Sequence, residues 1–246
     1  MVVQHNLSAM NTSRQMNSVS SAMSKSTEKL SSGYKINRAG DDAAGLSISE
    51  KMRSQIRGLN KAASNAQDGI SLVQVAEGAL NETHSILQRM NELATQAAND
   101  TNTSVDREAI QQELNQLTSE IDRIQSTTQF NSMNLLDGTF SSKALKLQVG
   151  AMSGQSISVS IAKMSASKLG LAGTDGKVSL KVSAFSSAGA AMKTIQDAIK
   201  TVSDTRSKLG AIQNRLEHTI NNLNTTSENT QAAESRIRDT DMASEM

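Results

Sequence analysis

The residues of this chain that could do chemistry are few and lie far apart. The chain has no cysteine, which removes disulfides, zinc–thiolate sites and cysteine nucleophiles together. Its three histidines, at positions 5, 84 and 218, are widely separated. We find no nucleophile–base–acid set, no glycine-rich phosphate loop and no cluster with metal-ligand spacing. The sequence therefore predicts an absence of catalytic, cofactor-binding and metal-binding residues, and a protein that is not an enzyme.

The adjacent carboxylates Asp41 and Asp42 could be read as a catalytic pair. They lie in the connector GYKINRAGDDAAG (33–45), which three glycines interrupt. Aspartate is a preferred N-cap residue, and its negative charge suits the first turn of a helix. We interpret this pair as the start of the next helix rather than as a catalytic site.

The composition favours long helices over a rounded, pocket-bearing core. Aromatic residues are 2% of the 246 residues, and tryptophan and proline are absent. An enzyme of this size usually uses aromatic side chains to fill its core and line a pocket. The lack of proline permits long uninterrupted helices, because proline removes a backbone donor and clashes with the preceding turn. The length is sufficient to bury a core.

The charge pattern argues against two classes of partner. The formal net charge is +1, with 25 basic and 24 acidic residues interspersed and no basic stripe, so we predict no nucleic-acid partner. No segment has the continuous apolar run of a membrane span, so we predict no membrane partner. The N-terminus also lacks the charged and apolar regions of a cleavable secretion signal.

The first expected helix, over residues 6–33, carries a thin apolar stripe at intervals of seven. Most residues between the members of this stripe are polar, and an isolated helix that buries so little is marginal in water. We therefore interpret the stripe as an assembly seam that another helix or another subunit covers. Its members are Ala9, Met16, Met23 and Leu30.

The strongest periodic pattern follows the connector and predicts a long helix that ends near Asn99–Asp100. A second apolar row starts at Ile56, turns polar at Glu77, His84 and Asn91, and indicates a buried face that rotates along the helix. Ala76, Met90 and Ala97 take over on the adjacent row. The main seven-residue row consists of Met52, Leu59, Ala66, Val73, Leu80, Leu87 and Ala94.

A short break then leads to a returning helix. Thr103 and Asp106 form a capping-box-like start. The following apolar residues repeat at 4-3 spacing, and the short break favours an antiparallel return. These residues are Ile110, Leu114, Leu117, Ile121 and Ile124.

From Phe130 the apolar period changes to two, which predicts a β-hairpin around Ser153–Gly154. KVSLKV (177–182) is a further candidate strand, within a region, 162–187, that we expect to be loop or small β-structure. A last helix is predicted from about Ala190 to Arg238. The fold class is therefore mostly α: an elongated antiparallel coiled-coil helical bundle with a small β-hairpin region.

The segment LSSGYKINRAGDDAAGLSISEKMRSQIRGL is similar to the N-terminal signature of the bacterial flagellin family. Five further segments of the chain resemble that family in the same order. The resemblance covers nearly the whole chain outside 162–187, and its motifs are long. The six segments are residues 30–59, 67–100, 130–138, 147–159, 209–223 and 234–246.

The resemblance implies a domain organisation. Residues 1–43 correspond to the N-terminal D0 helix and its connector, and residues 44–238 to the D1 bundle. A β-hairpin region of about 139–187 stands in place of the outer domains, and residues 239–246 begin the C-terminal D0 segment. Family members continue beyond this point with a D0 helix. We expect that its loss would leave the assembly seam uncovered and prevent stable filaments.

The resemblance also implies a function. The chain would be a structural subunit of the bacterial flagellar filament, polymerising through its terminal and D1 helices as a helical homo-oligomer for motility. It would be secreted to the flagellum by the flagellar export apparatus, with an export chaperone and the filament cap as partners. The alternatives are a hook-filament junction protein and a non-assembling coiled-coil binding module.

Resembling flagellins are bound by the innate immune receptor TLR5 through the D1 helices. The resemblance places the receptor contacts at Arg89 and Leu93 on the long helix and Glu113 on the returning helix, with Gln88 and Gln96 beside them. A spacing of four residues puts Arg89 and Leu93 on one face, and we expect all three residues to border the core without entering it. The alternative is that these residues face solvent or a neighbouring subunit.

Overall fold

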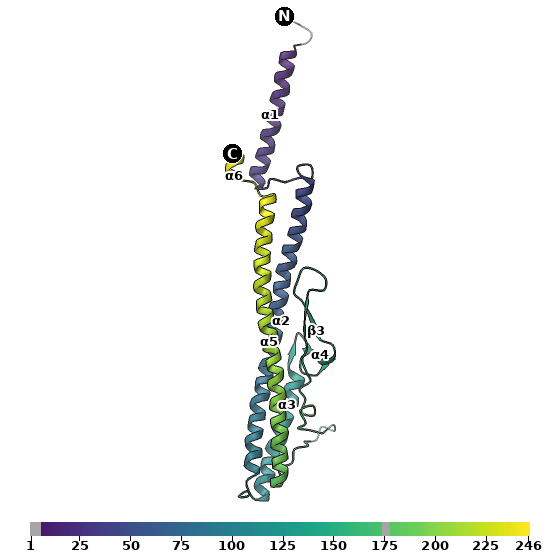
Figure 1. Cartoon of the computed structure of the whole chain (residues 1–246), viewed down its shortest axis with the longest axis vertical. Coiled ribbons are helices and arrows are strands. Elements are labelled where there is room, and N and C mark those ends of the chain that lie inside the picture. The colour runs from purple at the N-terminus through teal and green to yellow at the C-terminus, as the bar shows by residue number, and fades with distance from the viewer. Residues whose placement is uncertain (1–5, 174–177) are drawn as a thin grey trace. The chain divides into compact units, whose positions relative to one another are not determined.

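The computed structural model describes residues 6–173 and 178–246, and long helices dominate this part of the chain (Figure 1). The long helices are α1 (Leu7–Ser32), α2 (Ala43–Ala97), α3 (Ser104–Thr127) and α5 (Phe185–Arg238). The short elements are β1 (Gln129–Phe130), β2 (Met133–Asn134), α4 (Thr139–Ser142), β3 (Leu145–Gln148), β4 (Ser156–Val159) and α6 (Met242–Glu245). The mostly α fold class with a small β-hairpin region is thereby confirmed.

The chain divides into two compact units. Unit 1 comprises Met1–Lys61 and Leu223–Met246, and unit 2 comprises Ala62–Asn222. Both divisions fall inside the helices α2 and α5. The domain boundaries expected from the sequence, at 43/44 and 238/239, instead fall at the ends of these helices, so the two ways of dividing the chain differ.

Unit 2 has an apolar core in which α2, α3 and α5 pack together. The seven-residue row of α2 is buried from Ala66 to Ala94, and the rotated row of Ala76, Met90 and Ala97 is buried too. The helix α5 contributes a row of its own every seven residues. Its members Ile195, Val202, Leu209 and Leu216 are all 0% exposed.

The helices α2 and α5 run antiparallel within unit 2. Glu77 pairs with Arg206 at 3.6 Å, and farther along α2 the hydroxyl of Thr95 lies 3.3 Å from the sulfur of Met192. Residue numbers therefore rise along one helix as they fall along the other.

His84 is half-buried and lies on the second row of α2, where that row has turned from apolar to polar, as expected.

The turn between α2 and α3 is closed by polar contacts. Both halves of the predicted capping box form: Thr103 Oγ1 accepts from the backbone N–H of Asp106, and Asp106 Oδ2 accepts from the backbone N–H of Thr103 at 2.9 Å. Arg107 donates to the carbonyl of Ala97 at 3.1 Å and pairs with Asp100 at 3.0 Å. This arginine satisfies the last turn of α2, a contact that the sequence analysis did not identify.

The predicted β-hairpin is confirmed as β3 and β4, paired antiparallel with Leu147 opposite Ile157. The strand predicted at 177–182 is wrong for the residues described, since Val178 makes only an isolated bridge with Ala172; Lys177 lies outside the described residues. The side chain of Gln111 takes the place of a partner strand there. It donates to the carbonyl of Leu180 at 2.9 Å and accepts from the backbone N–H of Val182 at 3.0 Å.

The end of the region expected to be loop, 162–187, is helical, because α5 begins at Phe185 rather than at Ala190. The hydroxyl of Ser187 accepts from the backbone N–H of Ala184 at 3.0 Å, immediately before the first turn. The N–H groups at the start of a helix have no carbonyl acceptor within the helix, and the Ser187 hydroxyl supplies one for Ala184. The prediction therefore missed the first five residues of the helix.

In unit 1 the two aspartates have structural roles. Asp42 Oδ1 accepts from the backbone N–H of Gly45 at 2.9 Å and so caps the start of α2. Asp41 Oδ2 accepts from the backbone N–H groups of Arg38 and Asn37. The Arg38 hydrogen bond, followed by that of Asn37, lowers the pKa of Asp41 below its usual value. The contact of Asp42 supports the interpretation of this pair as a helix start, whereas Asp41 binds the connector that precedes the helix.

Two polar contacts join α2 to α5 within unit 1. Buried Ser49 donates to Glu234 at 2.7 Å, and Ser227 donates to Asn60 at 2.9 Å. Ser49 precedes Asn60 along α2, whereas their partners Glu234 and Ser227 come in the reverse order along α5. The two helices are therefore antiparallel in unit 1 as well.

The connectors of unit 1 are held by Arg238. Its guanidinium lies 4.7 Å from the ring centre of Tyr34 and pairs with Glu50 at 3.0 Å. Its carbonyl accepts from the backbone N–H of Lys35 at 2.7 Å, and the backbone N–H of Thr240 donates to Gly33 at 3.0 Å. The two connectors therefore lie side by side at this point.

Candidate functional site

An ion pair between α2 and α3 brings together two of the residues expected to bind a receptor. Arg89 Nη2 and Nε lie 3.0 and 3.1 Å from Glu113 Oε1. Arg89 also pairs with Glu92, three residues along its own helix, at 3.3 Å. The hydrogen bond to Glu113 is the largest reason why the pKa of Arg89 is raised above its usual value.

The side chains of this ion pair remain accessible, at 52% for Arg89 and 45% for Glu113. Gln88 and Gln96 are exposed as well, and Gln88 Nε2 lies 3.0 Å from His84 Nε2. We refer to Gln88, Arg89, Glu92, Gln96 and Glu113 as the α2–α3 rim. Glu92 is the member that the sequence analysis missed, although its spacing of three from Arg89 was a usable signal.

The expectation that Leu93 borders the core without entering it is wrong. This side chain is 2% exposed and belongs to the apolar core of unit 2. The reason is the rotation of the buried face, which at this point includes Met90, Leu93, Ala94 and Ala97. Leu93 therefore packs beneath the rim, between the exposed Arg89 and Gln96, and offers no surface to a partner.

The assembly seam on α1 lies mostly in contact with solvent. Met16 and Met23 are 69% and 70% exposed, Ala9 is exposed, and Leu30 is half-buried. The structure describes all of α1 and finds no buried residue in it. Near its C-terminal end, Lys29 and Ser26 both lie 3.0 Å from Glu245, so α1 contacts α6 there.

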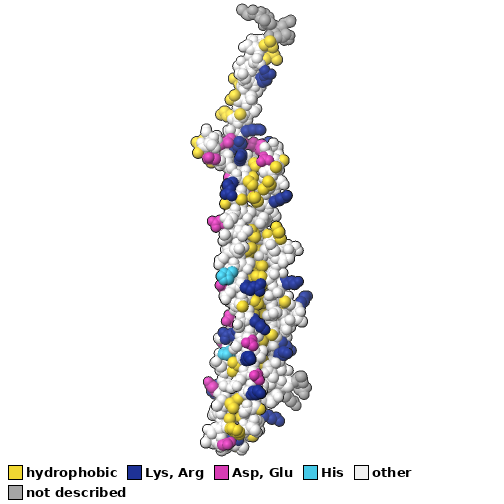
Figure 2. All heavy atoms as spheres, in the orientation of Figure 1, with side chains coloured by type: hydrophobic (Ala, Val, Ile, Leu, Met, Phe, Trp, Pro, Cys, Tyr) yellow, Lys and Arg dark blue, Asp and Glu magenta, His cyan; other side chains and the backbone are white. Residues whose placement is uncertain are grey.

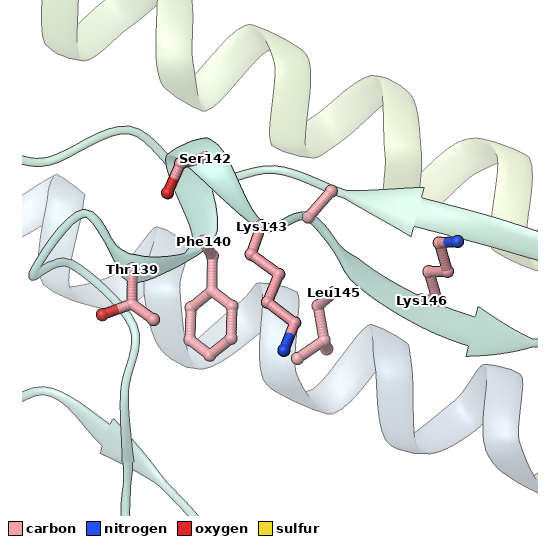
Figure 3. Close-up of a pocket in the computed structure, with 7 residues that line it drawn as sticks. Thr139, Phe140, Ser142, Lys143, Leu145 and Lys146 are labelled. Atoms are coloured by element: carbon pink, nitrogen blue, oxygen red, sulfur yellow. The ribbon is translucent and has the colours of Figure 1, made fainter.

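An open groove of about 740 Å³ lies beside α4 and β3. Figure 3 shows Phe140, Lys143 and Leu145 pointing to one side of it, whereas Lys146 points away from them. Its lining has no carboxylate and no histidine, so it offers no acid–base pair. Within residues 6–173 and 178–246, no three side chains are grouped as metal ligands, and no helix is long and apolar enough to cross a membrane.

The rim consists of guanidinium, carboxylate and carboxamide groups on two packed helices. Such groups donate and accept hydrogen bonds, so the arrangement is suited to binding a surface. Its Arg–carboxylate pair is also held by two helices whose buried faces share the core. A partner would therefore meet side chains whose positions are already fixed.

Comparison with known proteins identifies the family. Residues 3–141 match the family model of the bacterial flagellin N-terminal helical region, and residues 192–246 match that of the bacterial flagellin C-terminal helical region. Flagellin of Halalkalibacterium halodurans is 55% identical over 248 residues, covering 100% of this chain and 88% of the relative.

Solved structures agree with this assignment. The crystal structure of Bacillus cereus flagellin is 32% identical with a TM-score of 0.56, covering 70% of this chain and 94% of that one. A putative flagellar hook-associated protein from Vibrio parahaemolyticus has a TM-score of 0.66 over 81% of this chain and 100% of that one, but at 16% identity it shows the fold alone. The sequence identities favour a flagellin over a hook-filament junction protein. The chain belongs to the bacterial flagellin family.

Proposed function

We propose that this flagellin, a structural subunit of the bacterial flagellar filament, is bound as a monomer by the innate immune receptor TLR5 at the α2–α3 rim. The same surface would lie against a neighbouring subunit in the filament, so the two uses exclude each other. The observation that carries the proposal is the accessible ion pair of Arg89 and Glu113, with 3.0 Å between Arg89 Nη2 and Glu113 Oε1.

Three properties of the rim support a binding function. Arginine is enriched among residues that dominate interface energies, because its planar group forms several directed hydrogen bonds. Arg89 is already oriented by Glu113 and Glu92, so little side-chain freedom would be lost on binding. Gln88 and Gln96 extend the surface by hydrogen-bonding groups.

Leu93 has a supporting role in this proposal. Because it is 2% exposed, it acts by holding the helix surface that carries Arg89 rather than by touching the receptor. Replacing it would leave a cavity beneath the rim, and the effect on binding would follow the effect on stability.

For the filament, we propose that assembly uses the seam of Ala9, Met16, Met23 and Leu30. The exposure of Met16 and Met23, near 70%, supports a second helix or subunit as their cover. We assign α1 with its connector (1–43) to a D0 domain, 44–238 to D1 and 239–246 to the start of a C-terminal D0 segment. The proposal includes secretion to the flagellum through the flagellar export apparatus, with an export chaperone and the filament cap as partners.

Flagellins are structural filament proteins, so the prediction that the chain is not an enzyme is confirmed. Homo-polymerisation into the flagellar filament follows from the same membership.

The receptor proposal is tested with purified monomer and the receptor ectodomain. Arg89→Ala is expected to weaken binding by roughly 1–3 kcal/mol, the range for a contact near the centre of an interface. Arg123→Ala is the matched control, because Arg123 also pairs with a glutamate (Glu120) on an exposed helix face and is 62% exposed. Affinity is measured by surface plasmon resonance.

The Leu93→Ala variant tests whether Leu93 touches the receptor or only supports the helix surface that carries Arg89. If Leu93 acts from beneath the rim, this variant loses stability to denaturant, and its binding recovers at a temperature where the fold is intact. Equal affinities of the unchanged protein and an Arg89→Ala, Glu113→Ala double variant would remove the rim assignment.

A further inference from the structure

The charges of unit 2 are unevenly distributed along the chain. Between residues 139 and 196 the sequence has seven lysines, no arginine and one acidic residue, Asp175, a net charge of +6. Because the whole chain carries +1, the residues outside this segment carry −5. The even mixing of charge found for the chain as a whole therefore does not hold in this segment.

The lysines of this segment that the structure describes are exposed, and none of them takes part in an ion pair. Six of the seven belong to the residues that the structure describes, and all six are exposed. None of the ion pairs found among the described residues includes one of them. Arg89, Arg107 and Arg123 of α2 and α3 each have a carboxylate partner instead. The six are Lys143, Lys146, Lys163, Lys168, Lys181 and Lys193.

These lysines are displayed by segments that are packed onto the core. The backbone N–H of Met164, next to Lys163, donates to the carbonyl of Leu136 at 3.1 Å. Lys181 lies between Leu180 and Val182, which Gln111 holds. Figure 2 shows dark blue side chains without magenta ones among them along the edge of unit 2 where Figure 1 draws β3 and α4. We call the six lysines the basic surface.

We propose that the basic surface binds a linear polyanionic polysaccharide. The positive charges of the six exposed lysines raise the local concentration of a polyanion. Lysine presents a mobile point charge, which suits carboxylate or sulfate groups spread along a flexible chain. Exposed serines accompany the lysines and can hydrogen-bond sugar hydroxyls. They include Ser141, Ser142, Ser158 and Ser167.

The groove beside α4 gives this surface a place for a sugar ring. Its lining combines the half-buried apolar side chains of Phe140 and Leu145 with the ammonium group of Lys143 (Figure 3). One wall is therefore apolar and one edge is cationic. An acidic sugar has both a carbon-rich ring face and an anionic group, so it matches this lining.

The composition of the surface favours a polysaccharide over a nucleic acid. Single-stranded nucleic acids are bound by aromatic platforms and by arginine, and base edges are read by arginine, asparagine and glutamine. The segment 139–196 has no arginine, and of its two aromatic residues Phe140 is half-buried. A second copy of the chain, with the acidic remainder as its partner surface, is the other occupant that the experiment must separate.

The experiment measures binding of the full 246-residue chain to immobilised heparin, with uncharged dextran and single-stranded DNA as comparison polymers. The test variant replaces Lys143, Lys146, Lys163 and Lys168 by glutamine. The control variant replaces an equal number of exposed lysines of α2 and α5 by glutamine. They are Lys51, Lys61, Lys200 and Lys208.

The unchanged chain is expected to bind heparin and not dextran, with an affinity that falls as salt rises. The test variant is expected to lose affinity by at least about tenfold and to show a weaker salt dependence, because fewer cations are released on binding. The control variant is expected to stay within about threefold. Circular dichroism and melting of both variants confirm that each is folded.

Three results would overturn the proposal. Equal losses in the two variants would show an effect of net charge alone. Tighter binding of DNA than of heparin would assign the surface to nucleic acid. A change in self-association of the test variant in the absence of polymer, with heparin binding retained, would assign it to a second copy of the chain.

Discussion

Units 1 and 2 hold stretches of the same two helices, α2 and α5, by different means. In unit 2 the α2 row from Ala66 to Ala94 and the α5 row from Ile195 to Leu216 are 0% exposed. In unit 1 the buried apolar residues among those described are Ile36, Leu59 and Leu223, and the contacts between the helices include buried Ser49. Unit 2 is stabilised by its own core, whereas unit 1 relies on a small number of polar pairs.

This difference matches the task of a filament subunit. An apolar core gives a subunit a stable body before assembly. Polar pairs such as Ser49–Glu234 and Asn60–Ser227 add less stability, but they favour one register of two helices over others. In the assembly proposed above, neighbouring subunits would complete unit 1, and such a region needs a defined register more than it needs high stability as a monomer.

The largest effect is expected from cavities in unit 2. Leu87→Ala removes a side chain that is 0% exposed and should lower the free energy of unfolding by about 2–5 kcal/mol. Ile56→Ala in unit 1 removes a half-buried side chain and should cost less than about 2 kcal/mol. Chemical denaturation followed by circular dichroism measures both. Equal costs at the two sites would contradict the comparison.

A smaller effect is expected from the buried hydrogen bond of unit 1. Ser49→Ala leaves the Glu234 carboxylate without its 2.7 Å donor, which should cost about 1–3 kcal/mol. Ser54→Ala, on an exposed position of the same helix, is the control and should stay within about 0.5 kcal/mol. Hydrogen exchange of the α2 and α5 amides in unit 1 locates the loss. Protection lost throughout unit 2 instead would show that the two units unfold together.

The helix caps allow a matched comparison between the units. Thr103→Ala at the start of α3 and Asp42→Ala at the start of α2 each remove one N-cap acceptor, at a cost of about 1 kcal/mol. The cap in unit 2 should appear in the global free energy of unfolding. The cap in unit 1 should appear first in local exchange of the amides from Ala44 to Leu46, because little apolar burial couples this turn to a core. Identical exchange patterns for the two variants would contradict this.

The long helices could be predicted from the sequence because their information is periodic and local. The seven-residue row of α2, its rotation near Glu77 and the capping box of Thr103 all depend on residues within two turns of one another. The hairpin of β3 and β4 followed from alternation alone. The fold class could therefore be predicted from the sequence.

The errors arose where a distant contact overrides a local pattern. The alternating residues Val178, Leu180 and Val182 do not form a strand. Val178 makes an isolated bridge with Ala172, and the side chain of Gln111 binds the carbonyl of Leu180 and the backbone N–H of Val182. Leu93 was placed on the rim because its spacing from Arg89 fixes a helix face but does not fix the position of a third helix. The Arg89–Glu113 ion pair of the rim joins residues 24 positions apart, so spacing along one helix could not predict it. The pair forms because the turn between α2 and α3 brings the two helices together.

The smallest effect is expected from acid, at the contact of α1 with α6 in unit 1. Glu245 accepts from Lys29 and Ser26, and these contacts, Lys29 first, lower the pKa of Glu245 below its ordinary value of 4.5. A carboxylate with a lowered folded pKa binds its proton less readily in the contact than in the free chain. The contact is therefore fully formed above pH 4.5 and is lost as the pH falls through the lowered pKa.

NMR titration of the Glu245 carboxyl, with α6 amide exchange as a second signal, measures this loss. Glu245→Gln should remove the pH dependence between pH 3 and 5, roughly the range in which a glutamate titrates, while leaving the core of unit 2 unchanged. An α6 exchange rate that rises with acid in this variant as well would assign the effect to another group. The core of unit 2 contains no titratable group among its buried described residues, so acid is expected to act on the polar contacts of unit 1 rather than on that core.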